Sequence, residues 1–142
     1  MFLKSNKLKE DNNMPINKKT IVMDIDDTIC TTYNGDYVNA VPNHDMITKI
    51  KLYKDSGFQI VLFTARNMRS FDGDIEKITE HTVPVLEAWL TKYNVQYDQL
   101  MIGKPWAKEG FYVDDKAIRP REFVTSTYEE LKEICENDKL NF

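Results

Sequence analysis

The sequence predicts an α/β fold, a three-layer sandwich with a mainly parallel central sheet and no large cap domain. Two observations favour this class. Short apolar runs rich in β-branched residues alternate with segments of helical periodicity. The connections between them are short, which is typical of right-handed crossovers in a parallel sheet. With 142 residues and 42% hydrophobic content, the chain has material for one core, so we expect a single domain over residues 20–142.

Four apolar runs are expected to form the sheet. Each is short and is followed by polar or charged residues, as expected of a buried strand that ends at the edge of a sheet. The runs cover residues 20–24, 58–64, 99–103 and 111–113. Sites in such folds lie beyond the carboxyl ends of the strands.

Three helical patterns lie between and after these runs. The first covers residues 43–56 and begins with an asparagine that can cap it. The second begins near Ile75 and is interrupted or restarts around Pro84. The last is expected after Ser126 or Thr127, whose hydroxyls can cap a helix.

Two segments are candidates for a mobile lid over a site. Residues 31–41 are centred on Asn34-Gly35, a pair that favours positive φ and predicts a hairpin flap. Residues 67–74 contain Asp72-Gly73-Asp74 and form the second candidate. The sequence leaves open which of them covers the site, or whether a neighbouring subunit of a homo-oligomer does.

The first nineteen residues are expected to be a disordered leader. They are rich in Lys and Asn and lack apolar periodicity, so they cannot bury enough surface to offset the entropy of ordering. Met14 is an alternative start, because the first patterned segment begins just after it. The leader carries five lysines against Glu10 and Asp11, so the chain's net charge of −4 leaves about −7 for the rest.

Composition excludes several classes of function. The acidic balance argues against a nucleic-acid partner. The N-terminus lacks the apolar stretch of a signal peptide or membrane span, so we expect a cytoplasmic protein without a membrane partner. Cys30 and Cys135 form no CxxC pair, so neither a zinc site nor a disulfide framework is indicated.

Three carboxylates follow the first apolar run, and they need a counterion. Asp24, Asp26 and Asp27 either solvate a loop or hold a hard cation, and Mg²⁺ takes oxygen ligands while leaving room for waters and a substrate phosphate. Residues two apart share a face of a strand, so Asp24 and Asp26 can turn toward one crevice, with Asp27 elsewhere. An aspartate beside Mg²⁺ can attack phosphorus while a neighbouring carboxyl group transfers a proton.

The second run ends in Thr64, Arg66 and Asn67. A threonine here is often only a turn residue, but in a parallel sheet its hydroxyl can reach a phosphoryl oxygen bound at the first strand. Arg66 is either a surface charge or a clamp for substrate phosphate, because guanidinium suits bidentate phosphate contacts. With Asn67 it is our candidate for substrate binding.

The last two runs supply a cation and a second acidic pair. Lys104 can hold a nucleophile ionised and neutralise charge on a transferring phosphoryl group, although Lys108 and Lys116 lie near in sequence. Residues 111–113 run directly into Asp114-Asp115, candidate metal ligands. Two acidic strand ends combined with a threonine and a lysine at the others favour an active site over chance.

In this order, the residues resemble the four signatures of the haloacid dehalogenase-like superfamily, across about residues 20–125. The residues that match are Asp24-Ile25-Asp26-Asp27-Thr28 (DxDxT), Thr64, Lys104 and Asp114-Asp115. The resemblance implies a Rossmann-like core without a large cap, and a phosphatase with Asp24 as nucleophile and Asp26 as general acid/base. It implies Thr28 as a turn support and Thr64 and Lys104 as phosphoryl stabilisers.

The same resemblance implies a Mg²⁺ site and a substrate class. Mg²⁺ would bind Asp24, the Asp26 carbonyl and Asp114, while Asp115 holds a metal-bound water or orients Lys104. The strings at residues 63–69, 103–106 and 111–120 are similar to a narrower group labelled capsule-biosynthesis phosphatases. That label suggests a sugar phosphate, a polyol phosphate or another small phosphorylated metabolite.

Three other classes of function compete with this interpretation. A receiver domain also uses acidic residues, a threonine and a lysine, but its phosphoacceptor lies on a middle strand, where this chain has Thr64. A glycosyltransferase could use Asp24-Ile25-Asp26 as a metal-binding DxD motif, but the chain is short for a second substrate domain. A catalytically silent binding module would not need both acidic partners and Lys104.

Overall fold

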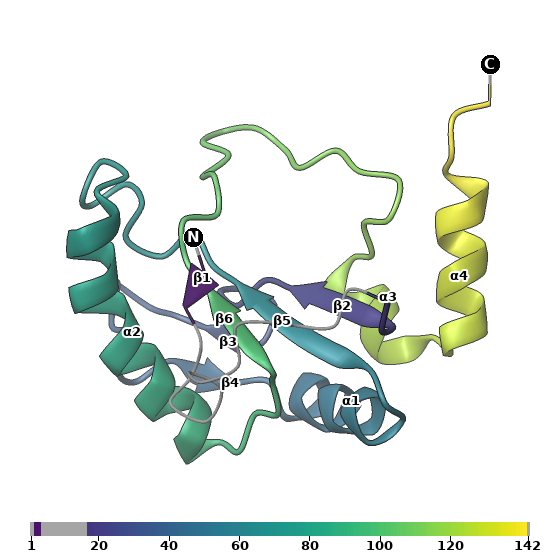
Figure 1. Cartoon of the computed structure of the whole chain (residues 1–142), viewed down its shortest axis with the longest axis horizontal. Coiled ribbons are helices and arrows are strands. Elements are labelled where there is room, and N and C mark those ends of the chain that lie inside the picture. The colour runs from purple at the N-terminus through teal and green to yellow at the C-terminus, as the bar shows by residue number, and fades with distance from the viewer. Residues whose placement is uncertain (1, 4–16, 142) are drawn as a thin grey trace. The chain divides into compact units, whose positions relative to one another are not determined.

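The computed structural model describes residues 2–3 and 17–141 (Figure 1). They divide into two compact units, Met1–Trp106 and Ala107–Phe142, and each is described by itself. Most of the expected leader lies outside the described residues. Its first part, Phe2–Leu3, forms a short strand (β1).

The first unit contains the parallel sheet that the sequence predicts. Its strands run in the order β1-β6-β5-β2, in which β2, β5 and β6 are parallel and β1 is antiparallel to β6. The parallel strands are β2 (Thr20–Met23), β5 (Gln59–Phe63) and β6 (Gln99–Met101). In this register Met23 lies opposite Leu62, and Phe63 opposite Met101, so all three strands end near one edge.

Helix α1 (His44–Asp55) connects β2 to β5, and its capping agrees with the sequence prediction. The side chain of Asn43 accepts the N–H of Met46, and Gly57 has a φ of 95° just after the helix. Met46, Ile50 and Tyr53 turn inward, at the spacing of one helix face.

Helix α2 (Ile75–Lys92) connects β5 to β6 and continues through Pro84, so the expected interruption is wrong. Proline removes one backbone hydrogen bond, but Pro84 and the residue whose carbonyl it frees are both exposed, so water can satisfy that carbonyl. The apolar face on both sides of Pro84 stays continuous from Ile78 to Leu90, which favours one helix.

The two crossovers move in the same direction across the sheet, from β2 to β5 and from β5 to β6. Right-handed connections in that order put both helices on one face of the sheet. The described first unit is therefore an α/β arrangement without a large cap. The third layer of the expected sandwich stays a prediction.

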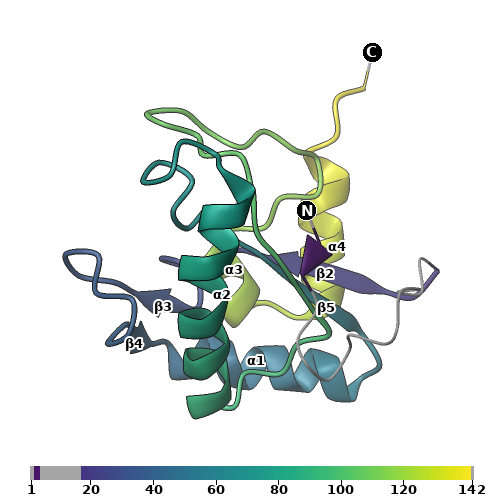
Figure 2. The same ribbon diagram turned by 60° about the vertical axis from the view of Figure 1, so that its left-hand side comes forward.

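A hairpin follows β2, as the Asn34-Gly35 pair predicts. Strands β3 (Cys30–Thr31) and β4 (Val41–Pro42) pair antiparallel, and Asn34 and Gly35 have φ values of 53° and 71°. Figures 1 and 2 both draw this hairpin beside α2. We call residues 31–41 the flap.

The predicted strand at residues 111–113 does not form. Phe111 and Val113 are 87% and 95% exposed, and no described strand pairs with this segment. A run of three residues becomes a strand only where a neighbouring strand takes up its N–H and C=O groups. Its apolar character alone was therefore insufficient.

The second unit contains two helices. Helix α4 (Tyr128–Asn137) begins at the cap that the sequence predicts, because Thr127 accepts the N–H of Glu130. Helix α3 (Pro120–Thr125) was not predicted, although Pro120 stands at its first position and the Arg119 N–H donates to Glu122. Its single turn and a half is too short to show periodicity.

Within the residues that the structure describes, no helix has both the length and the apolar character to cross a membrane.

Candidate active site

The acidic residues of the turn after β2 differ in their exposure to solvent. Ile25 is fully buried, and its carbonyl accepts the N–H groups of Thr28 and Ile29 at 3.1 and 2.8 Å. Asp24 and Asp26 flank Ile25 and lie on the opposite side, as alternation along a strand predicts. Asp27 is exposed, with a φ of 62°.

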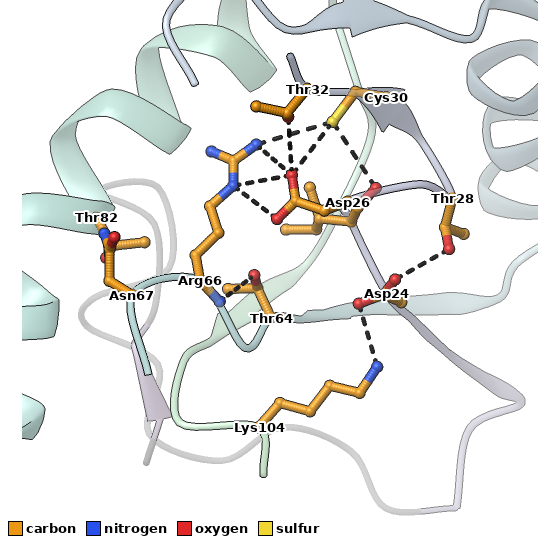
Figure 3. A network of polar contacts seen from close by, with 11 residues as sticks. Asp24, Asp26, Thr28, Cys30, Thr32, Thr64, Arg66, Asn67, Thr82 and Lys104 are labelled. Carbon is orange, nitrogen blue, oxygen red and sulfur yellow. Dashed lines mark hydrogen bonds and ion pairs between the residues drawn. The ribbon is translucent and has the colours of Figure 1, made fainter. Parts of the chain in front are cut away.

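The Asp24 carboxylate accepts a contact from a different side chain at each of its two oxygens (Figure 3). Lys104 Nζ lies 3.1 Å from its Oδ1, and Thr28 Oγ1 donates to its Oδ2 at 3.0 Å. The Asp24 side chain is still 35% exposed. The two contacts therefore fix the carboxylate without closing it off from a ligand.

Thr64 connects the ends of β5 and β6 through its backbone. Its N–H donates to the Met101 carbonyl at 3.0 Å, and its carbonyl accepts the Lys104 N–H at 3.1 Å. The Thr64 hydroxyl oxygen accepts the N–H of Arg66 at 3.0 Å, which leaves the hydroxyl proton available for another acceptor. Three of the four predicted strand ends thus meet around Asp24, Thr64 and Lys104.

Gly103 places Lys104 for this contact. It has a φ of 80°, where a side chain is strained, and a Cβ added there would lie 3.2 Å from Ile75 Cδ1 at the start of α2. The chain needs a glycine here because α2 packs closely against the end of β6.

Asp26 has a different partner, Arg66. Arg66 Nε and Nη2 lie 3.0 Å from Oδ2 and Oδ1 of Asp26, a two-pronged ion pair. The Arg66 side chain is only 1% exposed and that of Asp26 29%. Arg66 is thus not a surface charge but a buried cation that needs a counter-charge, which Asp26 supplies, and its role as a phosphate clamp stays a prediction.

Two further side chains surround the Asp26 carboxylate. Thr32 Oγ1 donates to Oδ1 at 3.2 Å, and the Cys30 thiol lies 3.7 Å from the same oxygen. Burial first, and the nearby Asp26 second, raise the pKa of Cys30 to about 11. Sequence reasoning missed Thr32, because only the fold of the flap brings it back to Asp26.

Asn67 supports the loop after β5. Its Nδ2 donates to Oγ1 of the buried Thr82 in α2 at 2.8 Å, and its φ is 63°. Asparagine tolerates this left-handed conformation better than most residues. The side chain expected to bind substrate therefore anchors residues 67–74 to α2.

The second acidic pair belongs to the second unit. The Lys116 N–H donates to Asp114 Oδ1 at 2.9 Å and lowers the pKa of Asp114. Asp114 and Asp115 are both exposed. Their part in a metal site stays a prediction.

The donors at Asp24 suit a hard cation. Each Asp24 oxygen accepts one described hydrogen bond and has a further lone pair, and Mg²⁺ takes oxygen ligands, commonly with one or two protein carboxylates. Among the described residues, no three His, Cys, Asp or Glu side chains form a metal-binding group. The residues fit an Mg²⁺ site that water and substrate oxygens complete.

One solved structure is clearly similar. A target protein from Vibrio cholerae, known from its crystal structure, is 42% identical to this chain, with a TM-score of 0.83 over 85% of this chain and 99% of that one. The chain belongs to the same family as this Vibrio cholerae protein. Because the match extends over nearly all of the other chain, the family shares the α/β core described above.

A second structure, of the Pnkp1/Rnl/Hen1 RNA repair complex, is 17% identical, with a TM-score of 0.44 over 88% of this chain and 32% of that one. No protein-family model and no curated protein matches the sequence.

Proposed function

We propose that the chain is a Mg²⁺-dependent phosphomonoesterase of the haloacid dehalogenase-like superfamily, with Asp24 as its nucleophile. The observation that carries this proposal is the meeting of Asp24, Thr64 and Lys104 at the ends of three parallel strands. A carboxylate, a hydroxyl and an ammonium group at one sheet edge suit the transfer of a phosphoryl group.

In the first step, an Asp24 oxygen attacks phosphorus and the bond from phosphorus to the ester oxygen breaks. Asp26, which this step requires to be protonated in the substrate-bound enzyme, donates its proton to that leaving oxygen, so an alcohol departs and an aspartyl-phosphate remains. Lys104 Nζ and the Thr64 hydroxyl stabilise the charge on the phosphoryl oxygens.

In the second step, water attacks the phosphorus of the aspartyl-phosphate. Asp26, now a carboxylate, takes a proton from that water, and the bond between Asp24 and phosphorus breaks to release phosphate. Thr28 holds Asp24 Oδ2 in the same orientation through both steps.

The contacts of Asp26 favour one oxygen for proton transfer. Oδ1 is surrounded by Thr32 Oγ1, Arg66 Nη2 and the Cys30 thiol. Among the described residues, Oδ2 accepts a hydrogen bond from Arg66 Nε alone. Oδ2 is therefore the oxygen that we assign to the proton.

Mg²⁺, when bound, would neutralise phosphate charge and orient the ester for in-line attack. We infer that Asp24 and the Asp26 carbonyl would hold it. As substrate we propose a sugar phosphate, a polyol phosphate or another small phosphorylated metabolite. Trp106 is exposed and lies two residues after Lys104, and the guanidinium carbon of Arg69 is 5.6 Å from its ring centre. Its ring offers an aromatic surface for the non-phosphate part of the substrate.

The test is hydrolysis of 4-nitrophenyl phosphate by the full chain, with Mg²⁺ and with EDTA. We expect activity only with Mg²⁺, and its loss in Asp24→Asn. Asp27→Asn is the matched control, because Asp27 is an exposed carboxylate of the same turn and asparagine tolerates its positive φ. Full activity in Asp24→Asn would refute the proposed mechanism.

Mass spectrometry after brief mixing with substrate separates this function from that of a receiver domain. Transient phosphorylation of Asp24 with continuous phosphate release supports the hydrolase. Stable phosphorylation without release supports the receiver. A panel of sugar, polyol and nucleotide phosphates then identifies the substrate class.

A further inference from the structure

The flap is tied to the core at three places. Trp89 Nε1 of α2 donates to the Ala40 carbonyl at 2.9 Å, and Thr32 donates to Asp26. The third contact is Tyr37, whose ring centre lies 4.3 Å from the guanidinium carbon of Arg66. The flap therefore rests on the ion pair of Asp26 and Arg66.

The contact with the Tyr37 ring stabilises a guanidinium group that is buried and only partly hydrogen-bonded. Its Nε and Nη2 donate to Asp26, but Nη1 is buried and has no hydrogen-bond partner among the residues that the structure describes. A desolvated guanidinium with an unpaired N–H group is costly. An aromatic face within 6 Å of a desolvated cation offsets part of that cost.

Tyr37 is itself held in place by the flap. Its N–H donates to the Gly35 carbonyl at 3.0 Å, and its carbonyl accepts the Ala40 N–H at 3.4 Å. Its side chain is half-buried, whereas Tyr33 on the same flap is 64% exposed. Of these two tyrosines, only Tyr37 has a described contact with the core.

We propose that Tyr37 is a positioning residue for acid/base catalysis: its ring stacks on Arg66 and thereby fixes the orientation of the Asp26 carboxylate. The catalytic part of this inference rests on the proposed phosphatase function. The contact uses the ring of Tyr37 and not its hydroxyl, so phenylalanine can replace it. Tyr37 acts only through Arg66 and needs no contact with substrate.

Steady-state kinetics on two substrates tests the catalytic part. An alkyl phosphate such as glycerol phosphate has a poor leaving group and needs the proton from Asp26, whereas 4-nitrophenyl phosphate has a good one and needs it less. Because general acid catalysis contributes about 10²- to 10⁴-fold, we expect Tyr37→Ala to lower kcat about 10-fold on the alkyl ester. We expect a loss of about 2-fold on the aryl ester, with KM nearly unchanged on both.

Two variants control for the loss of a side chain. Tyr37→Phe keeps the ring and is expected to retain wild-type kcat on both esters. Tyr33→Ala removes an exposed tyrosine from the same flap and is also expected to be unaffected. Equal losses on the two esters in Tyr37→Ala, or failure of phenylalanine to rescue, would overturn the proposal.

An NMR measurement tests the positioning directly, without activity. The Arg66 Nε–H resonance, assigned by its absence in Arg66→Lys, is expected to be shifted by the Tyr37 ring and protected from solvent exchange. Tyr37→Phe should keep both properties and Tyr37→Ala should lose both. An unchanged resonance in Tyr37→Ala would refute the positioning role even if the wild type is a phosphatase. If no phosphate ester is hydrolysed, the proposed function fails and this resonance alone decides whether Tyr37 positions Arg66.

Discussion

Asp24→Asn and Asp26→Asn remove one negative charge each from the same turn with almost no change of shape. Under the proposed mechanism both variants lose phosphatase activity. Their effects on the free energy of unfolding should nevertheless differ, because the two carboxylates have different partners. Lys104, the partner of Asp24, retains contact with solvent, whereas Arg66, the partner of Asp26, is almost fully buried.

The magnitudes follow from that difference. Removing one member of a buried ion pair costs about 3–5 kcal/mol. Since the Asp26 side chain is 29% exposed and asparagine keeps one acceptor oxygen, we expect about 2–3 kcal/mol for Asp26→Asn. For Asp24→Asn, a partly exposed pair, we expect about 0–1 kcal/mol. For a chain of this size these values correspond to losses in Tm of about 6–10 °C and at most about 3 °C.

Urea unfolding in Mg²⁺-free buffer, followed by tryptophan fluorescence, measures both variants. The m-value should stay constant, so that the shift in midpoint reports stability. Arg66→Met completes a double-mutant cycle: with the buried cation removed, Asp26→Asn should cost about 1–3 kcal/mol less than it does in the wild type. Equal stability of the two asparagine variants would refute the assignment of Asp26 as the counter-charge of Arg66.

Three further predictions concern residues around the site. Gly103→Ala should lower the free energy of unfolding by about 1–2 kcal/mol, because alanine is strained at this positive φ. It should also lower kcat by displacing Lys104, and an unchanged kcat would contradict this. Asn67→Ala should lower the free energy of unfolding by about 1–2 kcal/mol through the lost hydrogen bond to Thr82. If Asn67 only supports the loop, KM stays constant, whereas a raised KM would support the substrate-binding hypothesis. Because burial raises the pKa of Cys30 from 9.0 to about 11, stability from the neutral thiol is complete below pH 9 and lost between pH 9 and 11. In Mg²⁺-free buffer, the free energy of unfolding of Cys30→Ala should therefore fall by about 1–3 kcal/mol less over that pH interval than that of the wild type. An equal fall in both proteins would contradict a raised pKa of Cys30.

The sequence predicted the parts of the fold that depend on local pattern. Three apolar runs became parallel strands, and the carboxyl ends of parallel strands share one edge of a sheet, so Asp24, Thr64 and Lys104 could be brought together from their positions alone. The cap at Asn43 follows from equally local chemistry.

Features that depend on distant partners were predicted less well. Residues 111–113 have the apolar character of a strand, but a strand also needs a neighbour, which three residues do not specify. Pro84 suggested a break, but the apolar face of α2 outweighs one missing hydrogen bond. For Arg66, a surface charge and a phosphate clamp were both open, and its burial excludes the first; Tyr37, which covers its guanidinium group, lies about thirty residues earlier in the chain.

Under the proposed mechanism, the two carboxylates of the turn differ in function because they differ in surroundings. Asp24 faces an ammonium group that retains some solvent contact, and its oxygens keep lone pairs for a cation or a phosphoryl group. Asp26 is held by a buried guanidinium beneath Tyr37. A carboxylate that transfers protons needs a fixed orientation, and one that attacks phosphorus needs access to the substrate. The flap contacts Asp26 and Arg66 and leaves Asp24, the proposed nucleophile, accessible. The proposed mechanism therefore predicts that mutations in the flap act on proton transfer before they act on phosphate binding.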